Sequence, residues 1–95
     1  RGRPGAGAAP PRVMIVDDAS RTATVVEVRA HDRPGLLWRI GQALGACGLR
    51  VRAARVDTLG AEAVDVFYVV DENGRPLGAA DDLDAVRTEI LASLR

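Results

Sequence analysis

The sequence contains no lysine, one cysteine, one histidine and three aromatic residues among its 95 residues. One cysteine can neither close a disulfide within the chain nor supply the paired thiolates of a metal carrier. The 13 basic residues balance the 13 acidic ones, and this zero net charge argues against binding to nucleic acid or to an anionic membrane surface. No apolar run approaches the roughly 18 residues that a membrane span needs. Because an unpaired cysteine is usual in a reducing compartment, we expect a cytoplasmic protein.

The residues that nucleophilic catalysis requires are also missing. Such catalysis needs a serine or cysteine beside a base, with a third group that orients the base. His31 has no evident nucleophile beside it, and Cys47 lies on the apolar face of a predicted helix, where we expect it in the core. Phe67 and Tyr68 are neighbours that point to opposite faces of a strand, so they do not form the aromatic surface of an RNA-binding sheet. We therefore expect no catalytic residue, metal or cofactor in this chain.

The chain divides into a short leading segment and one domain. Residues 1–12, RGRPGAGAAPPR, are rich in glycine, proline and alanine and have no periodicity, which predicts a disordered linker. Residues 13–95 suffice for one domain and are too few for two. Because Arg1 is not an initiator methionine, we expect the chain to be a piece of a longer protein. The core would consist mainly of alanine, valine and leucine, so packing against a partner would increase its stability.

Four segments have the composition and the period of β-strands: 13–18, 22–31, 49–59 and 63–71. The first two lie close enough in sequence to pair as a hairpin. In the third, the alternation of apolar and charged residues slips near Ala53–Ala54, which predicts a β-bulge. The fourth is the most apolar and does not alternate between Val66 and Val70, which predicts that both of its faces are covered.

The segment 35–47 has the helical period instead. Pro34 is expected in its first turn and Gly48 at its end. Gly41 and Gly45 would each cost this helix roughly 1 kcal/mol relative to alanine, which favours close packing against them. The apolar face of the helix contains Leu36, Ile40, Ala43, Leu44 and Cys47.

The last segment is a second helix, capped by Asp81 or Asp82. Its apolar face contains Leu83, Val86, Ile90 and Leu94. The order of elements is therefore strand, strand, helix, strand, strand, helix, which predicts the α+β class. A four-stranded antiparallel sheet with two helices on one face, a ferredoxin-like architecture, is the simplest way to bury this pattern. The usual ferredoxin-like order is βαββαβ, so we expect the added strand 13–18 to fill the edge that the missing last strand would occupy.

The stretch HDRPGLL, residues 31–37, joins the second strand to the first helix. Gly35 has no Cβ where the chain turns, and the first N–H groups of the helix are free to bind an anionic group. Asp32 lies beside them and can accept a hydrogen bond from an ammonium group. Free N–H groups beside one carboxylate match a zwitterionic amino acid, and the alternative is a plain helix start that binds nothing.

The stretch HDRPGLLWRIGQALGACGLRVRAARVDTLG resembles the first half of an ACT domain, a small regulatory module that senses amino acids. That family usually opens with a strand, then D-x-P-G-L-L, then a helix that ends in glycine. Together with ARVDTLGAEAVDVFYVVDENGRPL, the sequence is most similar to the C-terminal ACT domains of the protein-PII uridylyltransferase/uridylyl-removing enzyme family. The likeness runs from Arg12 to Leu94.

This resemblance implies a role and a site. ACT domains of that family sense glutamine and bias a nucleotidyltransferase domain against a hydrolase domain, so this chain alone would not be an enzyme. The resemblance implies ligand-binding residues at the turn and at the start of the next strand: Asp32, Arg33, Pro34, Gly35, Leu36, Leu37 and Arg50. Asp32 would hold the ammonium group, and Arg50, often supplied by a neighbouring ACT domain, would hold the carboxylate.

The partners implied by the resemblance are glutamine, a second ACT domain and, for the larger protein, the PII signalling protein. The second ACT domain would be another copy of this chain or a neighbour in the same protein, and the transferred group would be uridylyl or adenylyl. One alternative is an interaction module that pairs with another ACT domain and binds no small molecule. The other is an ACT domain of a different amino-acid-regulated protein, such as an alarmone synthetase or a biosynthetic enzyme.

Overall fold

The computed structural model describes residues 9–16, 22–78 and 81–95. These residues form four strands and two helices in the predicted order. The elements are β1 Arg12–Val16, β2 Thr24–His31, α1 Leu36–Ala46, β3 Arg50–Leu59, β4 Glu62–Val70 and α2 Leu83–Ser93. The end of the predicted first strand, residues 17–18, and most of the predicted linker lie outside the described residues.

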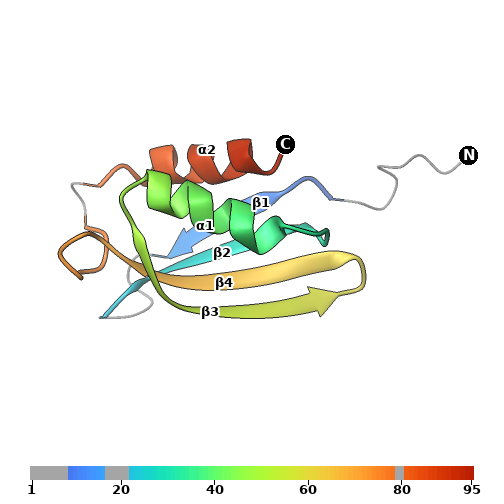
Figure 1. Cartoon of the computed structure of the whole chain (residues 1–95), viewed down its shortest axis with the longest axis horizontal. Helices are drawn as coiled ribbons and strands as arrows, with labels where there is room; N and C mark the ends of the chain where they lie inside the picture. Colours follow the sequence, from blue (N-terminus) through green and yellow to red (C-terminus); the bar gives the residue numbers. More distant parts are fainter. Residues whose placement is uncertain (1–8, 17–21, 79–80) are drawn as a thin grey trace, which may run out of the picture.

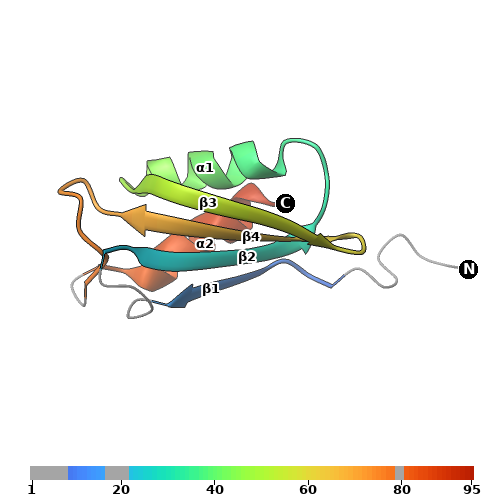
Figure 2. The same cartoon turned by 90° about the horizontal axis from the view of Figure 1, so that it is seen from below.

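The four strands form one antiparallel sheet in the order β1-β2-β4-β3 (Figure 1). β1 pairs with β2 in a register that sets Val13 opposite Val28, and β2 pairs with β4 so that Val26 lies opposite Phe67. β1 therefore occupies the edge beside β2, which confirms that the added strand fills the place of the missing one. The other edge of the sheet is β3 (Figure 2).

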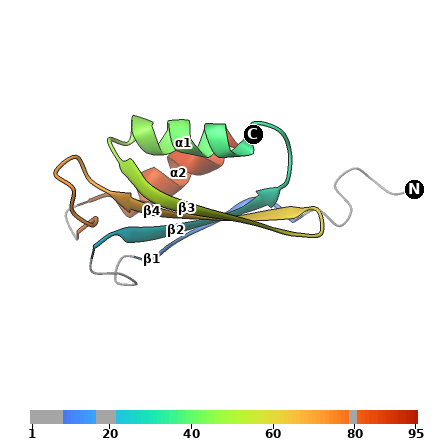
Figure 3. The same ribbon diagram turned by 60° about the horizontal axis from the view of Figure 1, so that its bottom comes forward.

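Both helices cover the same face of the sheet, as predicted (Figure 3). Alternate residues of β2 and β4 are buried on this face and pack against the apolar sides of α1 and α2. Six apolar side chains of this layer are 0% exposed: Val26, Val28, Val69, Ile40, Leu44 and Ile90. Burying each such side chain contributes roughly 1.5 to 3 kcal/mol, so this layer holds the helices on the sheet.

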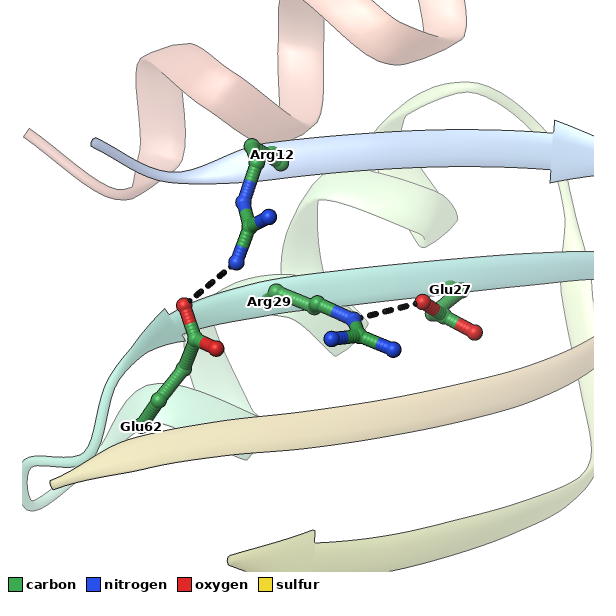
Figure 4. A network of polar contacts seen from close by, with 4 residues as sticks. All are labelled: Arg12, Glu27, Arg29 and Glu62. Carbon is green, nitrogen blue, oxygen red and sulfur yellow. Dashed lines mark hydrogen bonds and ion pairs between the residues drawn. The ribbon is translucent and has the colours of Figure 1, made fainter. Parts of the chain in front are cut away.

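The opposite face of the sheet is open and has charged side chains on it. Arg12 of β1 reaches across β2 to Glu62 of β4, with Nη2 and Oε2 2.7 Å apart (Figure 4). On β2, Arg29 Nε lies 2.8 Å from Glu27 Oε2. Ion pairs that are this exposed to water contribute little to stability. In the described part of the chain, apolar cover therefore lies on the helix side of the sheet.

The covering of β4 differs from the prediction. The expectation that both faces are covered between Val66 and Val70 is wrong, because both helices lie on one side of the sheet. Val66 and Tyr68 point to the open face and are only partly buried. In β3 the register shifts between Val51 and Ala53, which confirms a bulge where the sequence pattern slips.

The two helices begin differently. α1 begins later than predicted: Pro34 precedes it, Gly35 is its N-cap residue and Leu36 is its first residue. α2 begins as predicted, because the Asp82 Oδ1 accepts a hydrogen bond from the Ala85 N–H at 3.0 Å. In the part of the chain that the structure describes, neither helix has the length and apolar character needed to cross a membrane.

Candidate functional site

A pocket of about 370 Å³ lies at the end of the sheet where β2 turns into α1. One wall is the turn with the first residues of α1, and the other wall comes from β3 and β4 near the loop that joins them (Figure 1). The first wall contains Asp32, Arg33, Gly35, Leu36, Leu37 and Trp38, and the second contains Val56, Ala63 and Asp65. The volume lies near the lower end of the range for small-molecule pockets, roughly 300 to 1,000 Å³.

The turn between β2 and α1 is held in place by its backbone. The Asp32 N–H donates to the carbonyl of Ala61 at 2.8 Å, which ties the turn to the loop between β3 and β4. Gly35 then has a φ of +81°, which a residue with a Cβ adopts only with strain. This glycine lets the chain pass directly from the extended segment into α1, so the first turn of the helix lies against the pocket.

The N-terminus of α1 offers free hydrogen-bond donors. It has no side-chain cap and no acidic residue in its first turn. The Leu36 N–H donates to the Arg33 carbonyl at 3.3 Å, whereas the N–H groups of Leu37 and Trp38 have no acceptor among the described residues. Both of these residues line the pocket, so this wall can bind an anionic group.

Acidic groups line the pocket as well. Asp32 is exposed in the turn, whereas Asp65 on β4 is 1% exposed and neither of its carboxylate oxygens has a partner among the described residues. Burial raises the pKa of the Asp65 carboxyl, and the nearby Asp32 raises it further. Arg33 also lines the pocket, but its guanidinium Nη2 donates to the carbonyl of Leu94 beyond α2, at 2.7 Å. The pocket therefore combines free N–H donors with two carboxyl groups.

The structure brings most of the residues implied by the resemblance together. Those on the pocket wall are Asp32, Arg33, Gly35, Leu36 and Leu37. Pro34 is exposed in the turn beside them. Arg50 is elsewhere: it pairs with Val70 on β4, seven residues from Ala63 of the pocket wall and thus about 23 Å along the strand. Arg50 could reach a pocket of this kind only from a second domain.

Four wall residues were not predicted: Trp38, Val56, Ala63 and Asp65. The last three come from strands that meet the turn only when the sheet has formed. For Asp65 the sequence does contain a signal. It is an acidic residue at an inward position of the most apolar strand, between the inward residues Ala63 and Phe67. For Val56 and Ala63 the sequence contains no comparable signal, since small and apolar side chains are ordinary in a strand.

An exposed apolar surface continues from the pocket along β3. All ten residues of β3 are exposed, and its outer edge pairs with no strand in the described part of the chain. Trp38 is 69% exposed, Val56 54% and Leu37 45%. A Cβ at Gly41 or Gly45 of α1 would meet nothing within 4 Å, so the close packing predicted for these glycines does not occur within the part of the chain that the structure describes.

The arrangement is suited to binding a small molecule. Among the residues that the structure describes, no three histidine, cysteine, aspartate or glutamate side chains are placed to hold a metal ion. His31 is exposed at the end of β2. Cys47 is partly buried against the core, where burial raises the pKa of its thiol and so disfavours the reactive thiolate. Free N–H donors and carboxyl groups in one pocket match the carboxylate and the ammonium group of a zwitterion.

Comparison with known proteins gives relatives along nearly all of the chain. The ACT domain family model matches residues 24–91. A bifunctional uridylyltransferase/uridylyl-removing enzyme of Streptomyces coelicolor is 56% identical over 86 residues, which cover 90% of this chain and 10% of that protein. A protein with the same name from Phenylobacterium zucineum is 44% identical over 93 residues, 98% of this chain and 10% of that protein. The chain thus spans about a tenth of the length of the curated relatives it matches.

One solved structure shares the fold. The crystal structure of an unknown protein from Galdieria sulphuraria superimposes with a TM-score of 0.60 at 23% sequence identity. The match covers 79% of this chain and 40% of that one. At this level of identity the likeness concerns the architecture of the sheet and helices alone.

Proposed function

The chain belongs to the ACT domain family, and from that premise we propose that it is a regulatory domain that binds an amino acid, with glutamine as the ligand. The observation that carries the proposal is the pocket at the β2–α1 turn, where free N–H groups of α1 and carboxyl groups line the same cavity. The N–H groups of Leu37 and Trp38 would bind the α-carboxylate, and Asp32 would bind the α-ammonium group. A ligand with both charges would satisfy both sets of groups.

Glutamine suits such a site better than glutamate. The side-chain carboxylate of glutamate would add a negative charge near Asp32, and like charges at short range repel strongly where water is excluded. Calorimetric titration should therefore give a weak but measurable affinity for glutamine and a weaker one for glutamate. A folded sample that gives no heat with any of the twenty amino acids would contradict amino-acid binding and favour a domain that only pairs.

The domain also pairs, in this proposal, with a second ACT domain, either another copy or a neighbour within a longer protein. The long exposed strand β3 supports this, because proteins usually cover or pair such an edge. Antiparallel pairing of two β3 edges would bring Arg50 of the second domain to the Leu59 end of the first, beside the pocket. Light scattering at tens of micromolar should give about twice the 10.0 kDa mass of the chain, and the single-chain mass alone would contradict the homodimer.

We propose further that the domain is part of a longer enzyme like its relatives. There it would regulate a cytoplasmic nucleotidyltransferase that acts on the PII signalling protein. The names of the Streptomyces and Phenylobacterium relatives support this parentage. Glutamine added to the full-length protein should shift the balance from transfer of the nucleotidyl group towards its removal. The mass of modified PII would identify the group as uridylyl or adenylyl. A balance between transfer and removal that does not change when glutamine is added would contradict the proposed regulation.

A further inference from the structure

Asp65 is a charged residue in a place that ordinarily contains an apolar one. It lies on the helix-facing side of β4, where its neighbours along the strand on the same face are Ala63 and Phe67. The residue is 1% exposed, and within the described part of the chain neither Oδ1 nor Oδ2 has a hydrogen-bond partner. Burying a carboxylate without a partner is strongly unfavourable, so the fold alone does not account for an aspartate at this position.

The surroundings of Asp65 make its charge still less favourable. Its partners across the sheet, Val28 on β2 and Val56 on β3, are apolar. The nearby charged group is another carboxylate, that of Asp32, which disfavours a second negative charge. Arg33 lines the same pocket, but its guanidinium donates to the Leu94 carbonyl. A cation that neutralises Asp65 would therefore have to come from outside this set of residues.

Asp65 borders the pocket, so a cation bound there would lie close to the buried carboxyl group. Asp65 lines the cavity together with Asp32 and the free N–H groups of Leu37 and Trp38. Asp32 is exposed and Asp65 is buried, so the two carboxyl groups lie at different depths. An ammonium group has three N–H donors, and two carboxyl groups that reach the same cavity can accept them.

We infer that Asp65 is the second ammonium-binding residue of this pocket and that, with Asp32, it restricts the ligand to molecules that contain a primary ammonium group beside a carboxylate. The inference rests on the proposed amino-acid binding and adds to it the reason why the pocket would select an ammonium group. The ligand's ammonium group replaces the missing partner of Asp65, while the carboxylate is held by the helix N–H groups. A hydroxy acid of the same shape would leave Asp65 without a cation, and sites with unmatched buried polar groups reject such analogues strongly.

A cycle of two ligands and two proteins tests this role. The ligands are L-glutamine and its α-hydroxy analogue, in which a hydroxyl group replaces the ammonium group, and the proteins are the parent and Asp65→Asn. The parent should bind glutamine more than a hundred-fold more tightly than the analogue, because the analogue loses the charge-assisted hydrogen bonds to both Asp32 and Asp65, each worth about ten- to a hundred-fold. Asp65→Asn should lose about ten- to a hundred-fold of this preference and keep the part that Asp32 contributes, because the change weakens glutamine binding and leaves binding of the analogue nearly unchanged.

The matched control is Asp57→Asn, which removes the same charge from β3. Asp57 pairs with Val64, so it lies on the open face of the sheet, away from the pocket, and it should leave both affinities unchanged. Glutamine binding by Asp65→Asn that equals the parent's would overturn the inference and leave the proposed amino-acid binding intact. A parent that binds no amino acid would overturn both.

A measurement on the parent alone covers the case in which Asp65→Asn does not fold. If the parent binds the α-hydroxy analogue as tightly as glutamine, the ammonium group makes no net contribution and the inference is overturned. A preference above a hundred-fold, more than the hydrogen bond to Asp32 alone would give, supports the inference, and a smaller preference overturns it.

Discussion

The two helices of this domain begin in opposite ways. In α2, the Asp82 side chain accepts from the Ala85 N–H, and Asp84 adds a negative charge to the first turn. In α1, Gly35 is the N-cap residue, no side chain caps the helix, and the first turn has no acidic residue. A helix start that satisfies its own N–H groups needs no other group, whereas a start that leaves them free beside a pocket is available to a ligand.

The difference does not come from a shortage of aspartates near α1. Asp32 precedes the first helix as Asp82 precedes the second, but its side chain makes no capping bond to α1. The left-handed conformation of Gly35 and the hydrogen bond from the Asp32 N–H to the Ala61 carbonyl set the turn so that this carboxyl group lies at the pocket instead. The same residue type therefore stabilises one helix and lines a cavity at the other.

The change with the largest expected effect on the free energy of unfolding is Gly35→Val. It should destabilise the domain by roughly 1 to 3 kcal/mol, because a β-branched residue is strained at the φ of +81°. A Cβ at this position would meet nothing within 4 Å, so the backbone alone sets the cost. Gly35→Asn should therefore cost less, since asparagine tolerates the left-handed conformation. Urea unfolding followed by circular dichroism measures both, and equal losses would contradict a backbone origin.

The next largest effect is expected at the other helix start. Asp82→Ala should destabilise the domain by about 1 kcal/mol, because the Ala85 N–H loses its acceptor. Asp82→Asn keeps an acceptor and serves as the control. Glutamine affinity should be the same in both variants, since Asp82 is not part of the pocket. A weaker affinity in Asp82→Ala, measured by calorimetry, would remove the distinction between a structural helix start and a binding one.

Stability should depend on pH through Asp65. Its pKa is raised above the ordinary 3.8, so the folded domain holds this proton more tightly than the unfolded chain does. The contribution of Asp65 is therefore fully present below 3.8 and is lost as pH rises to the raised pKa. The charged groups that share its pocket are Asp32 and Arg33, the latter held by the Leu94 carbonyl.

The measurement for this prediction is the difference in unfolding free energy between the parent and Asp65→Asn across a series of pH values. The parent should lose stability relative to the variant as pH rises, and the difference should become constant above the raised pKa. Subtracting the two proteins removes the contributions of the other carboxyl groups. A difference that stays constant from pH 3 upward would show that burial does not make the ionisation of Asp65 less favourable.

The smallest expected effect on stability belongs to Asp32→Ala. Asp32 is exposed and its side chain caps nothing, so the change should stay within about 0.5 kcal/mol. Glutamine affinity should nevertheless fall about ten- to a hundred-fold, because one charge-assisted hydrogen bond is lost. Calorimetry and thermal unfolding on the same sample separate the two effects. Undiminished binding in Asp32→Ala would mean that HDRPGLL is only a helix start with a charge beside it.

The sequence predicted most of the fold because the relevant signals are local. Apolar residues at helical spacing identified the faces of both helices, and the cap of α2 was predicted as Asp81 or Asp82, of which the structure shows Asp82. The slip in the pattern of β3 predicted the bulge. Which face of β4 is covered was not predictable in this way, because apolar residues on both faces of a strand do not indicate on which side the helices lie.

The candidate site was predictable only on one of its walls. The turn from Asp32 to Leu37 is continuous in sequence, and its glycine, its carboxylate and its helix start could be read together. Val56 and Asp65 reach the same pocket from two strands, through a register that pairs them with each other. Arg50 shows the converse. It pairs with Val70, which lies about 23 Å along β4 from Ala63 of the pocket wall, so the formed sheet keeps it away from the pocket.

By itself, the sequence determined the order of the elements, the buried side of each helix and the turn that leaves the start of α1 uncapped. These features depend on backbone preferences and on contacts between residues a few positions apart, which the sequence states directly. Only the tertiary structure decided that Asp65 is buried without a partner among the described residues, that it lines the same pocket as the start of α1, and that β3 stays exposed. Those features depend on strand register and on which face the helices cover, and both are settled by the packing of the whole core.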